Sequence, residues 1–307
     1  MSDESPILMM LAAWPLQGSL RIEQLGGGFN SHTWRITCDS GRFVAKLAPH
    51  SPTFEAGLAV AEYLEQLGFR AGGPLRTSAG ALTICLGDQM LALLRFVPGA
   101  PLDPSRRQDI YIWGQAMAQV HTLLRQIPDV PAGLPRWPWA WLDPTVDHLD
   151  VAAWVRPAVV SVLEELRRIE ATRPLTLGVV HGDGASVLLD PATGARAVID
   201  WGAAMWGPLL YDVASARWLF QFQHGHNPHD FGPFLAAYRG QAPLPAGELD
   251  ALDLFVRLRC VVQAFYFSWR IANDIRTGLA DSSANQRGLD QARQAWEQLS
   301  AVTSFEF

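Results

Sequence analysis

The chain of 307 residues is nearly devoid of lysine: among its 24 basic residues Lys46 is the only lysine, and the others are arginines. Basic residues also form no run or cluster, and the formal net charge is −6 with a pI near 5.7. Such a surface has no general attraction for phosphate backbones or anionic lipids. We therefore expect neither a nucleic acid nor a membrane surface as a partner.

Cysteine is scarce as well, and the three cysteines (Cys38, Cys85 and Cys260) lie far apart in the sequence. An odd number of widely spaced cysteines argues against a disulfide framework and fits reduced thiols in the cytosol. The first residues, MSDESPILMM, begin acidic and their apolar part is soon interrupted, so we expect neither a signal peptide nor a membrane span. With 49% apolar residues, the chain is expected to be a compact protein large enough for two lobes.

The only lysine follows a glycine-rich turn. Residues 20–48 read as a strand, a turn at Gly26, Gly27 and Gly28, a second strand, a tight turn and a third strand that carries Lys46. Because a strand follows the glycines, where a Rossmann or P-loop site would have a helix, the pattern favours a hairpin flap. A flap over phosphates, with a lysine on the next strand, is how kinase-like enzymes hold ATP. The alternative is an ordinary glycine hairpin with an exposed lysine.

The rest of the first lobe is predicted as one helix and two strands. Residues 53–68 have helical apolar spacing, and either Glu55 or Glu62 on this helix could pair with Lys46 and hold it toward a nucleotide. A solvated helix face is the alternative for either glutamate. The second strand runs toward Pro98, and the backbone at Phe96 and Val97 is a candidate linker that hydrogen-bonds an adenine ring. We predict a nucleotide-binding lobe over residues 1–97 and a helical lobe over residues 98–307.

Helices dominate after Pro101. Apolar spacing predicts one helix from Ile110 to Leu124, another over residues 151–169 and a long core helix over residues 252–272, whose arginines argue against a membrane span. His121 is expected to pack or form hydrogen bonds within the core. Residues 224–230, HGHNPHD, are expected to form a polar loop, with a zinc site as the less favoured alternative. Aromatic residues after Trp201 suit a cationic acceptor, although each ring is more simply explained as core.

Two carboxylates stand out in the segment VVHGDGASVLLDPATGARAVIDWG, residues 179–202. Short apolar strands flank a loop that carries Asp183, and a hairpin leads into a strand that ends at Asp200. The two side chains are thus expected at the ends of neighbouring strands. Phosphoryl transfer needs such a pair: one carboxylate to accept the proton of the attacking hydroxyl and one to hold Mg²⁺ against the phosphates.

These motifs, in this order, resemble the aminoglycoside phosphotransferase and choline kinase superfamily, whose fold is similar to that of protein kinases. The similarity rests on GGGFNS, RFVAKL, RFVPG, VVHGDG, VIDWG and GPLLYDVA and covers nearly the whole chain. It implies an α+β fold with a small β-rich lobe and a larger helical lobe. It also implies an enzyme that uses ATP and Mg²⁺ to phosphorylate a hydroxyl of a small molecule, an aminoglycoside-, choline- or homoserine-like acceptor. It further implies these roles: Asp183 as the base, Asp200 as the metal ligand, Lys46 at the α- and β-phosphates, Gly26 to Ser31 as the phosphate flap, and Asp212 and His181 as supports of the catalytic loop.

One departure from the family pattern concerns the metal site. In the family, HGD is usually followed after four further residues by an asparagine that ligates the metal. Here the loop reads about two residues shorter, and Ser186 is the nearest oxygen donor. Either Asp200 and Ser186 hold one metal ion that suffices for turnover, or the protein is a catalytically silent, kinase-like module that binds a nucleotide or other ligand. We predict an active phosphotransferase, because the base, the lysine and the second carboxylate are all present.

Overall fold

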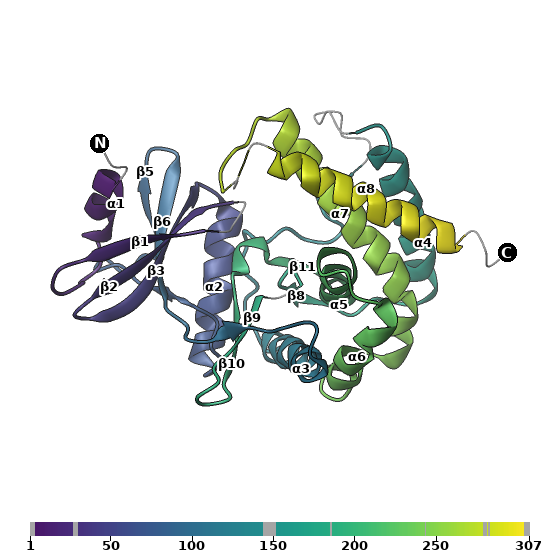
Figure 1. The fold of residues 1–307 in the computed structure, drawn as a ribbon, viewed down its shortest axis with the longest axis horizontal. Helices are drawn as coiled ribbons and strands as arrows, with labels where there is room; N and C mark the ends of the chain where they lie inside the picture. The colour runs from purple at the N-terminus through teal and green to yellow at the C-terminus, as the bar shows by residue number, and fades with distance from the viewer. Residues whose placement is uncertain are drawn as a thin grey trace.

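The structure is a computed structural model that describes residues 4–26, 30–143, 152–184, 186–242, 244–278, 281 and 283–303. It has a small part built on an antiparallel sheet and a larger part built mainly of helices (Figure 1). Gly27 and Gly28 of the predicted flap lie outside the described residues.

The small part is a six-stranded antiparallel sheet. Its strand order is β1-β2-β3-β6-β4, with β5 also paired to β6. Lys46 lies in the middle of β3, opposite Thr33 of β2 and Ala92 of β6. Helix α1 buries Ile7 and Leu11 against the sheet. The bounds of the elements are α1 Glu4–Leu11, β1 Arg21–Leu25, β2 His32–Cys38, β3 Gly41–Pro49, α2 Pro52–Gln66, β4 Pro74–Leu75, β5 Ile84–Leu86 and β6 Gln89–Arg95.

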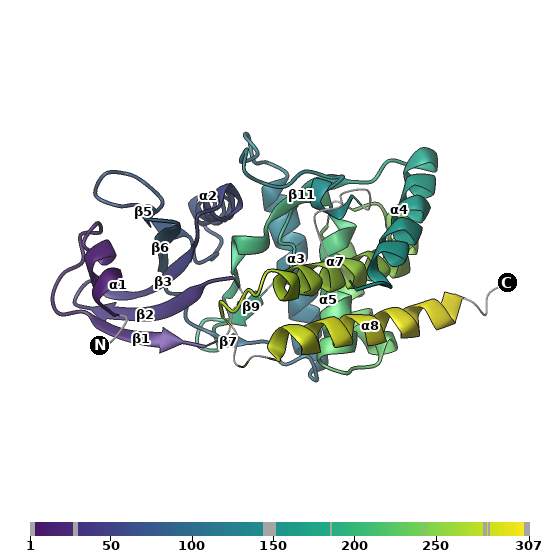
Figure 2. The ribbon, with the colours of Figure 1, turned by 90° about the horizontal axis from the view of Figure 1, so that it is seen from above.

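Helix α2 stands between the sheet and the larger part, as Figures 1 and 2 show. Its start follows from the sequence, since the Ser51 side chain accepts a hydrogen bond from the Thr53 backbone N–H and Pro52 occupies the first turn. Phe54 and Leu58 pack onto the sheet beside Met90 and Ala92. The predicted helix over residues 53–68 is therefore confirmed, with an end at Gln66.

Gly57 lets α2 approach the larger part closely. A Cβ atom at this position would lie 2.2 Å from the carbonyl oxygen of Trp201, which is part of the 3-10 turn Trp201–Ala203 directly after Asp200. No side chain fits there unless the helix or the turn moves. Gly57 thus fixes the separation between α2 and the segment that carries Asp200.

We expect Gly57→Ala to destabilise the fold by about 1–3 kcal/mol through this steric overlap, although alanine is the better helix former. Thermal unfolding followed by circular dichroism checks the effect. Gly232→Ala is the matched control, because open space surrounds Gly232 at the start of α6. An unfolding temperature for Gly57→Ala that equals or exceeds that of the control would contradict the close approach.

Within its described residues, the larger part contains six α-helices and two small sheets. Strands β9 and β10 form the predicted hairpin and β7 joins them, while β8 pairs with β11. The helices predicted from Ile110 and over residues 151–169 are confirmed as α3 and α4 with shifted ends. The bounds are β7 Ala100–Pro101, α3 Arg107–Leu124, α4 Val155–Thr172, β8 Leu177–Val180, β9 Ser186–Leu189, β10 Arg196–Ile199, β11 Met205–Pro208, α5 Leu210–Trp218, α6 Gly232–Arg239, α7 Leu252–Ala272 and α8 Ala284–Thr303.

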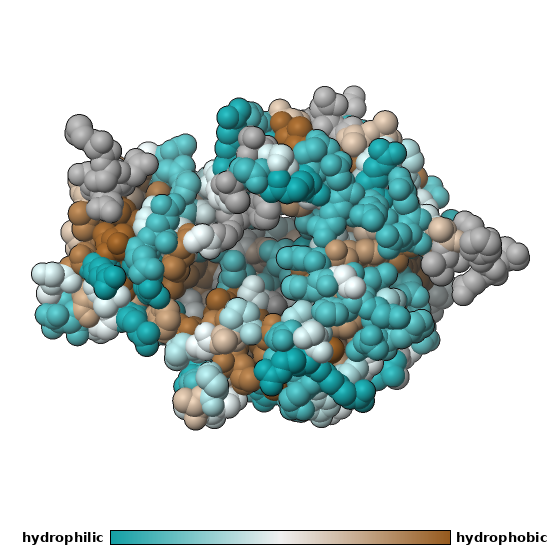
Figure 3. Space-filling model, in the orientation of Figure 1, coloured by the Kyte–Doolittle hydropathy of each residue, from teal (hydrophilic) through white to brown (hydrophobic). Residues whose placement is uncertain are grey.

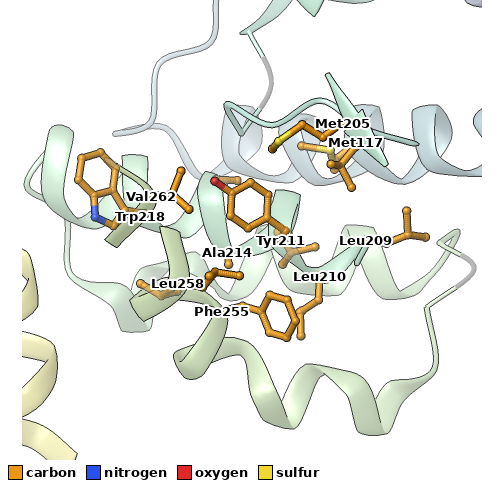
Figure 4. Packing of buried hydrophobic residues seen from close by; sticks show 14 of the residues in the cluster. Met117, Met205, Leu209, Leu210, Tyr211, Ala214, Trp218, Phe255, Leu258 and Val262 are labelled. Atoms are coloured by element: carbon orange, nitrogen blue, oxygen red, sulfur yellow. The ribbon is translucent and has the colours of Figure 1, made fainter. Parts of the chain in front are cut away.

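Helices α5 and α7 cross in the centre of this part. Tyr211 and Trp218 of α5 and Phe255 and Leu258 of α7 are buried together (Figure 4). The prediction that residues 252–272 form a core helix is confirmed. Among the described residues, no helix is both long enough and apolar enough to cross a membrane. In the view of Figure 3 the larger part presents a mostly hydrophilic face, and more hydrophobic residues show on the small part.

Candidate active site

The two parts of the molecule meet at an ion pair between Lys46 and Asp200. Lys46 Nζ lies 2.5 Å from Asp200 Oδ1, and the lysine side chain is only 14% exposed whereas the aspartate is 52% exposed. A small pocket of about 20 Å³ lies against this pair, lined by residues of α2 and by Gly72, Leu94 and Trp201. The only lysine of the chain therefore lines this pocket, and its ammonium group faces the Asp200 carboxylate.

Asp200 has a backbone conformation that is unusual for a residue with a side chain. Its φ is 69° and its ψ is 63°, in the left-handed region that costs a non-glycine residue about 1–2 kcal/mol. Burial raises the pKa of this carboxyl, but the charge and hydrogen bond of Lys46 outweigh it, so that the net pKa lies below the ordinary value. The group is ionised at neutral pH. One oxygen contacts Lys46, and a hydrogen bond from the backbone of Gly202 also favours the ionised form.

Neither glutamate predicted to pair with Lys46 does so. Glu55 Oε1 accepts a hydrogen bond from Thr83 Oγ1 at 2.5 Å. Glu62 forms two hydrogen bonds with the guanidinium of Arg76, at 2.6 and 2.7 Å. Both side chains have partners within the small part, so the predicted ion pair from α2 is wrong for this structure, and Asp200 takes its place.

The loop between β8 and β9 carries Asp183, whose side chain is 54% exposed. Its Oδ1 accepts a hydrogen bond from Arg259 Nη2 of α7 at 3.2 Å. The loop also touches the segment around Asp200, because His181 Nε2 donates to the carbonyl of Ile199 at 2.9 Å. Asp183 and Asp200 are therefore presented by two loops in direct contact, as expected for neighbouring strand ends.

The Asp212 side chain holds the Asp183 loop through hydrogen bonds from the backbone of that loop. This fully buried carboxylate accepts hydrogen bonds from the N–H groups of His181, at 2.6 Å, and Gly182, at 2.8 Å. Burial alone would raise the pKa of Asp212, but the hydrogen bond and charge of His121 and the further contacts lower it below the ordinary value. Asp212 and His181 thus support the loop as the resemblance implied.

A buried chain of hydrogen bonds continues behind Asp212. His121 Nε2 lies 3.0 Å from Asp212 Oδ2, and its Nδ1 lies 2.7 Å from the hydroxyl of Tyr238. Because a carboxylate only accepts, Nε2 carries a hydrogen that it donates to Asp212, and the Tyr238 hydroxyl is the partner of Nδ1. The expectation that His121 forms hydrogen bonds within the core is confirmed.

The glycine of the His-Gly-Asp sequence is required by geometry. Gly182 has φ 88°, and a Cβ atom there would lie 2.2 Å from the carbonyl oxygen of Ala203. The positive φ turns the chain so that Asp183 points outward, while the backbone amides of His181 and Gly182 face inward to Asp212. Gly182 therefore couples the loop to the segment after Asp200.

The flap and the linker are only partly described. Ser31 is buried, and no atom lies within 4 Å of the place where a Cβ on Gly26 would stand. Phe96 and Val97 are half-buried and follow the end of β6, with the Arg42 guanidinium 4.4 Å from the centre of the Phe96 ring. Val97 lies beside Gly72, which lines the pocket next to Lys46.

Ser186 is the first residue of β9 and pairs with Ile199, one residue before Asp200. Ser186 is exposed, and the β9–β10 pairing places it opposite the residue that precedes Asp200. One carboxylate and a hydroxyl are a small ligand set, which suits Mg²⁺ because this ion usually keeps several waters and shares its shell with phosphates. No cluster of three or more His, Cys, Asp or Glu side chains suited to a metal exists in the described part, including residues 224–230.

Helix α7 makes polar contacts to the Asp183 loop and to the predicted flap. Besides Arg259, the Tyr266 hydroxyl of this helix donates to Asn30 Oδ1 at 2.7 Å, which joins the flap to the larger part. Burial raises the pKa of Tyr266, against the Arg270 charge, and the charge of Asp183 adds to the rise. Asn30 lies in the predicted flap and Tyr266 among the aromatic residues considered for the acceptor, but sequence reasoning missed Arg259, because the pattern of α7 shows only a core helix. Many aromatic residues offered as acceptor contacts are core instead, namely Trp218, Phe220, Phe234, Tyr238 and Phe267.

Comparisons with known proteins place this arrangement in a family. A model of the phosphotransferase enzyme family matches residues 21–255. A homoserine kinase from Bradyrhizobium sp. (strain BTAi1) is 28% identical over 210 residues, which cover 65% of this chain and 63% of that protein. The chain thus spans less than two thirds of the length of this relative.

Solved structures share the fold. The amicoumacin kinase hAmiN, solved with AMP-PNP and Ca²⁺, has a TM-score of 0.73 at 14% identity and covers 97% of this chain and 94% of its own. Choline kinase LicA from Streptococcus pneumoniae has a TM-score of 0.65 at 15% identity, with 97% and 100% covered. These likenesses confirm the predicted α+β, two-lobed, protein-kinase-like fold.

Proposed function

The chain belongs to the phosphotransferase enzyme family, and from this premise we propose that it transfers the γ-phosphate of ATP to a hydroxyl group of a small molecule. The observation that carries the proposal is the ion pair between Lys46 and Asp200, together with the hydrogen bond that joins the Asp183 loop to Ile199, next to Asp200. A cation from the small part and two carboxylates from the larger part are the groups that phosphoryl transfer requires. The division of the chain at residue 97 and the cytosolic location stay predictions, the latter supported by three free cysteines.

In the proposed reaction Asp183 accepts the proton of the acceptor hydroxyl. The oxygen of this hydroxyl attacks the γ-phosphorus, and ADP leaves. Lys46 contacts the α- and β-phosphates, and the flap from Gly26 to Ser31 covers the phosphate chain through backbone amides. Asp200, with Ser186 in the place of the family's asparagine, would hold Mg²⁺. When bound, the ion neutralises charge on the β- and γ-phosphates.

For the acceptor we propose a small hydroxylated amino acid of the homoserine kind. The homoserine kinases that this chain resembles in sequence support it. Choline and aminoglycosides, which the aromatic content favours, are the acceptors to compare with it.

The test is ATP consumption with homoserine, choline, ethanolamine and aminoglycosides, with Mg²⁺ and after its removal by chelation. We expect turnover with homoserine-like acceptors, at least about tenfold faster than without an acceptor, and loss of turnover on chelation. Asp200→Ala should abolish the dependence on Mg²⁺ together with the activity. Calorimetry separates the alternative: Mg²⁺-dependent ATP binding without turnover on any acceptor would identify a silent binding protein, and no ATP binding would refute both ideas.

A further inference from the structure

Arg259 is a buried cation at the centre of the candidate site. It lies on α7, and its side chain is 9% exposed. Nη2 donates to Asp183 Oδ1 at 3.2 Å, while Nη1 donates to the carbonyl of Gly182 at 3.2 Å and to the hydroxyl of Tyr211 at 3.3 Å. One guanidinium thus contacts both the proposed base and the backbone carbonyl just before it.

Its environment gives this arginine only one counter-ion. Among the described residues Asp183 is the carboxylate that forms an ion pair with Arg259, and the ring of Trp218 lies 5.9 Å from the guanidinium carbon. Asp212, the other buried carboxylate nearby, is occupied by backbone amides and His121. A buried ion pair is weak evidence for stability, since apolar residues of similar volume often serve as well. The specific consequence of this arginine is the orientation that it imposes on Asp183.

We propose that Arg259 is a positioning residue for Asp183, an inference that rests on the proposed function. The guanidinium holds Oδ1, so that Oδ2 is the oxygen that faces the acceptor hydroxyl. In the transfer step the hydroxyl proton moves to Oδ2, the acceptor oxygen forms its bond to the γ-phosphorus, and the bond from that phosphorus to the oxygen of the leaving ADP breaks. Because arginine stays protonated, its charge and both of its loop contacts persist through the step.

The fork geometry of the guanidinium makes the proposal specific. Arg259 reaches a carboxylate oxygen and a backbone carbonyl with two different nitrogens, which a single ammonium on a flexible stem cannot reproduce. Lysine at this position would keep the charge and lose the double contact. Glutamine would lose both. The two variants therefore separate the effect of charge from the effect of orientation.

The experiment compares Arg259→Lys, Arg259→Gln and Arg257→Gln by steady-state kinetics. Arg257 is the matched control, because it lies on the same helix, is similarly buried and pairs with Glu165 at 2.9 Å, away from Asp183. We expect kcat to fall about 10- to 100-fold in Arg259→Gln and by less in Arg259→Lys, with KM for ATP within about twofold of wild type. Arg257→Gln should keep kcat at temperatures where it remains folded.

A second measurement tests the contact independently of turnover. Thermal unfolding of Arg259→Gln, Asp183→Asn and the double variant should be non-additive, since the two side chains share one interaction. Coupling together with a kcat in Arg259→Gln equal to that of Arg257→Gln would overturn the positioning role. Additive unfolding would overturn the contact itself. A wild-type protein without turnover on any acceptor would refute the proposed function and the positioning role with it, and the coupling would then report only a structural ion pair.

Discussion

Asp183→Asn should lower kcat by about 10²- to 10⁴-fold, the range that a positioned general base contributes. The amide cannot accept the hydroxyl proton, whereas the shape of the side chain is unchanged. Its oxygen can still accept the hydrogen bond from Arg259, and this bond is the main contact that ties the side chain to the core. Binding of ATP should persist, because Lys46 and Asp200 are untouched.

The measurement is acceptor-dependent ADP release, with circular dichroism to show that the variant is folded. Asparagine is a sharper choice than alanine, since Asp183→Ala removes the counter-ion of a buried arginine and confuses loss of the base with loss of stability. Asp190→Asn is the control: this aspartate lies in the turn between β9 and β10, bonded to Thr193 and Ala192, and should leave kcat unchanged. Equal turnover by Asp183→Asn and wild type would exclude Asp183 as the base.

Much of the fold follows from local sequence signals. The strand around Lys46, the capped helix α2 and the β9–β10 hairpin are each determined by a few consecutive residues. Such features depend on turn chemistry and on alternation along a single segment. The same holds for the order of the motifs, from which the two-lobed fold could be predicted before any contact between distant segments was known.

The partners of charged side chains could not be predicted in this way. Glu55 and Glu62 lie on helix α2, as predicted, but they form hydrogen bonds with Thr83 and Arg76 of the small part and not with Lys46. Arg259 looks like an ordinary charge in a core helix until α7 crosses α5 and brings it to Asp183. These choices depend on distances of a few ångströms between segments far apart in the chain. Sequence patterns specify the elements, and packing specifies which of their polar atoms meet.

The second large effect is expected at Asp212, which no solvent or ligand reaches. Asp212→Asn replaces one acceptor oxygen by an amide N–H₂ group that faces donors. The backbone N–H groups of His181 and Gly182 and the ring N–H of His121 then compete for one remaining oxygen. Leaving buried donors without a partner next to a lost charge costs about 3–5 kcal/mol. We expect a correspondingly lower free energy of unfolding in urea, and a loss of turnover beyond it because the Asp183 loop is no longer held.

The pH dependence distinguishes this role from simple loss of packing. The native pKa of Asp212 is lowered, so its carboxylate stabilises the fold fully above the unfolded pKa of about 3.9, and this contribution disappears as the pH falls through the native value. The difference in unfolding free energy between wild type and Asp212→Asn should therefore be constant from pH 8 to about pH 5 and shrink in stronger acid. His121→Gln offers a comparison, because it removes one partner of Asp212 and leaves both loop amides bonded. If the difference stayed constant at low pH, the charge of Asp212 would not be what braces the catalytic loop.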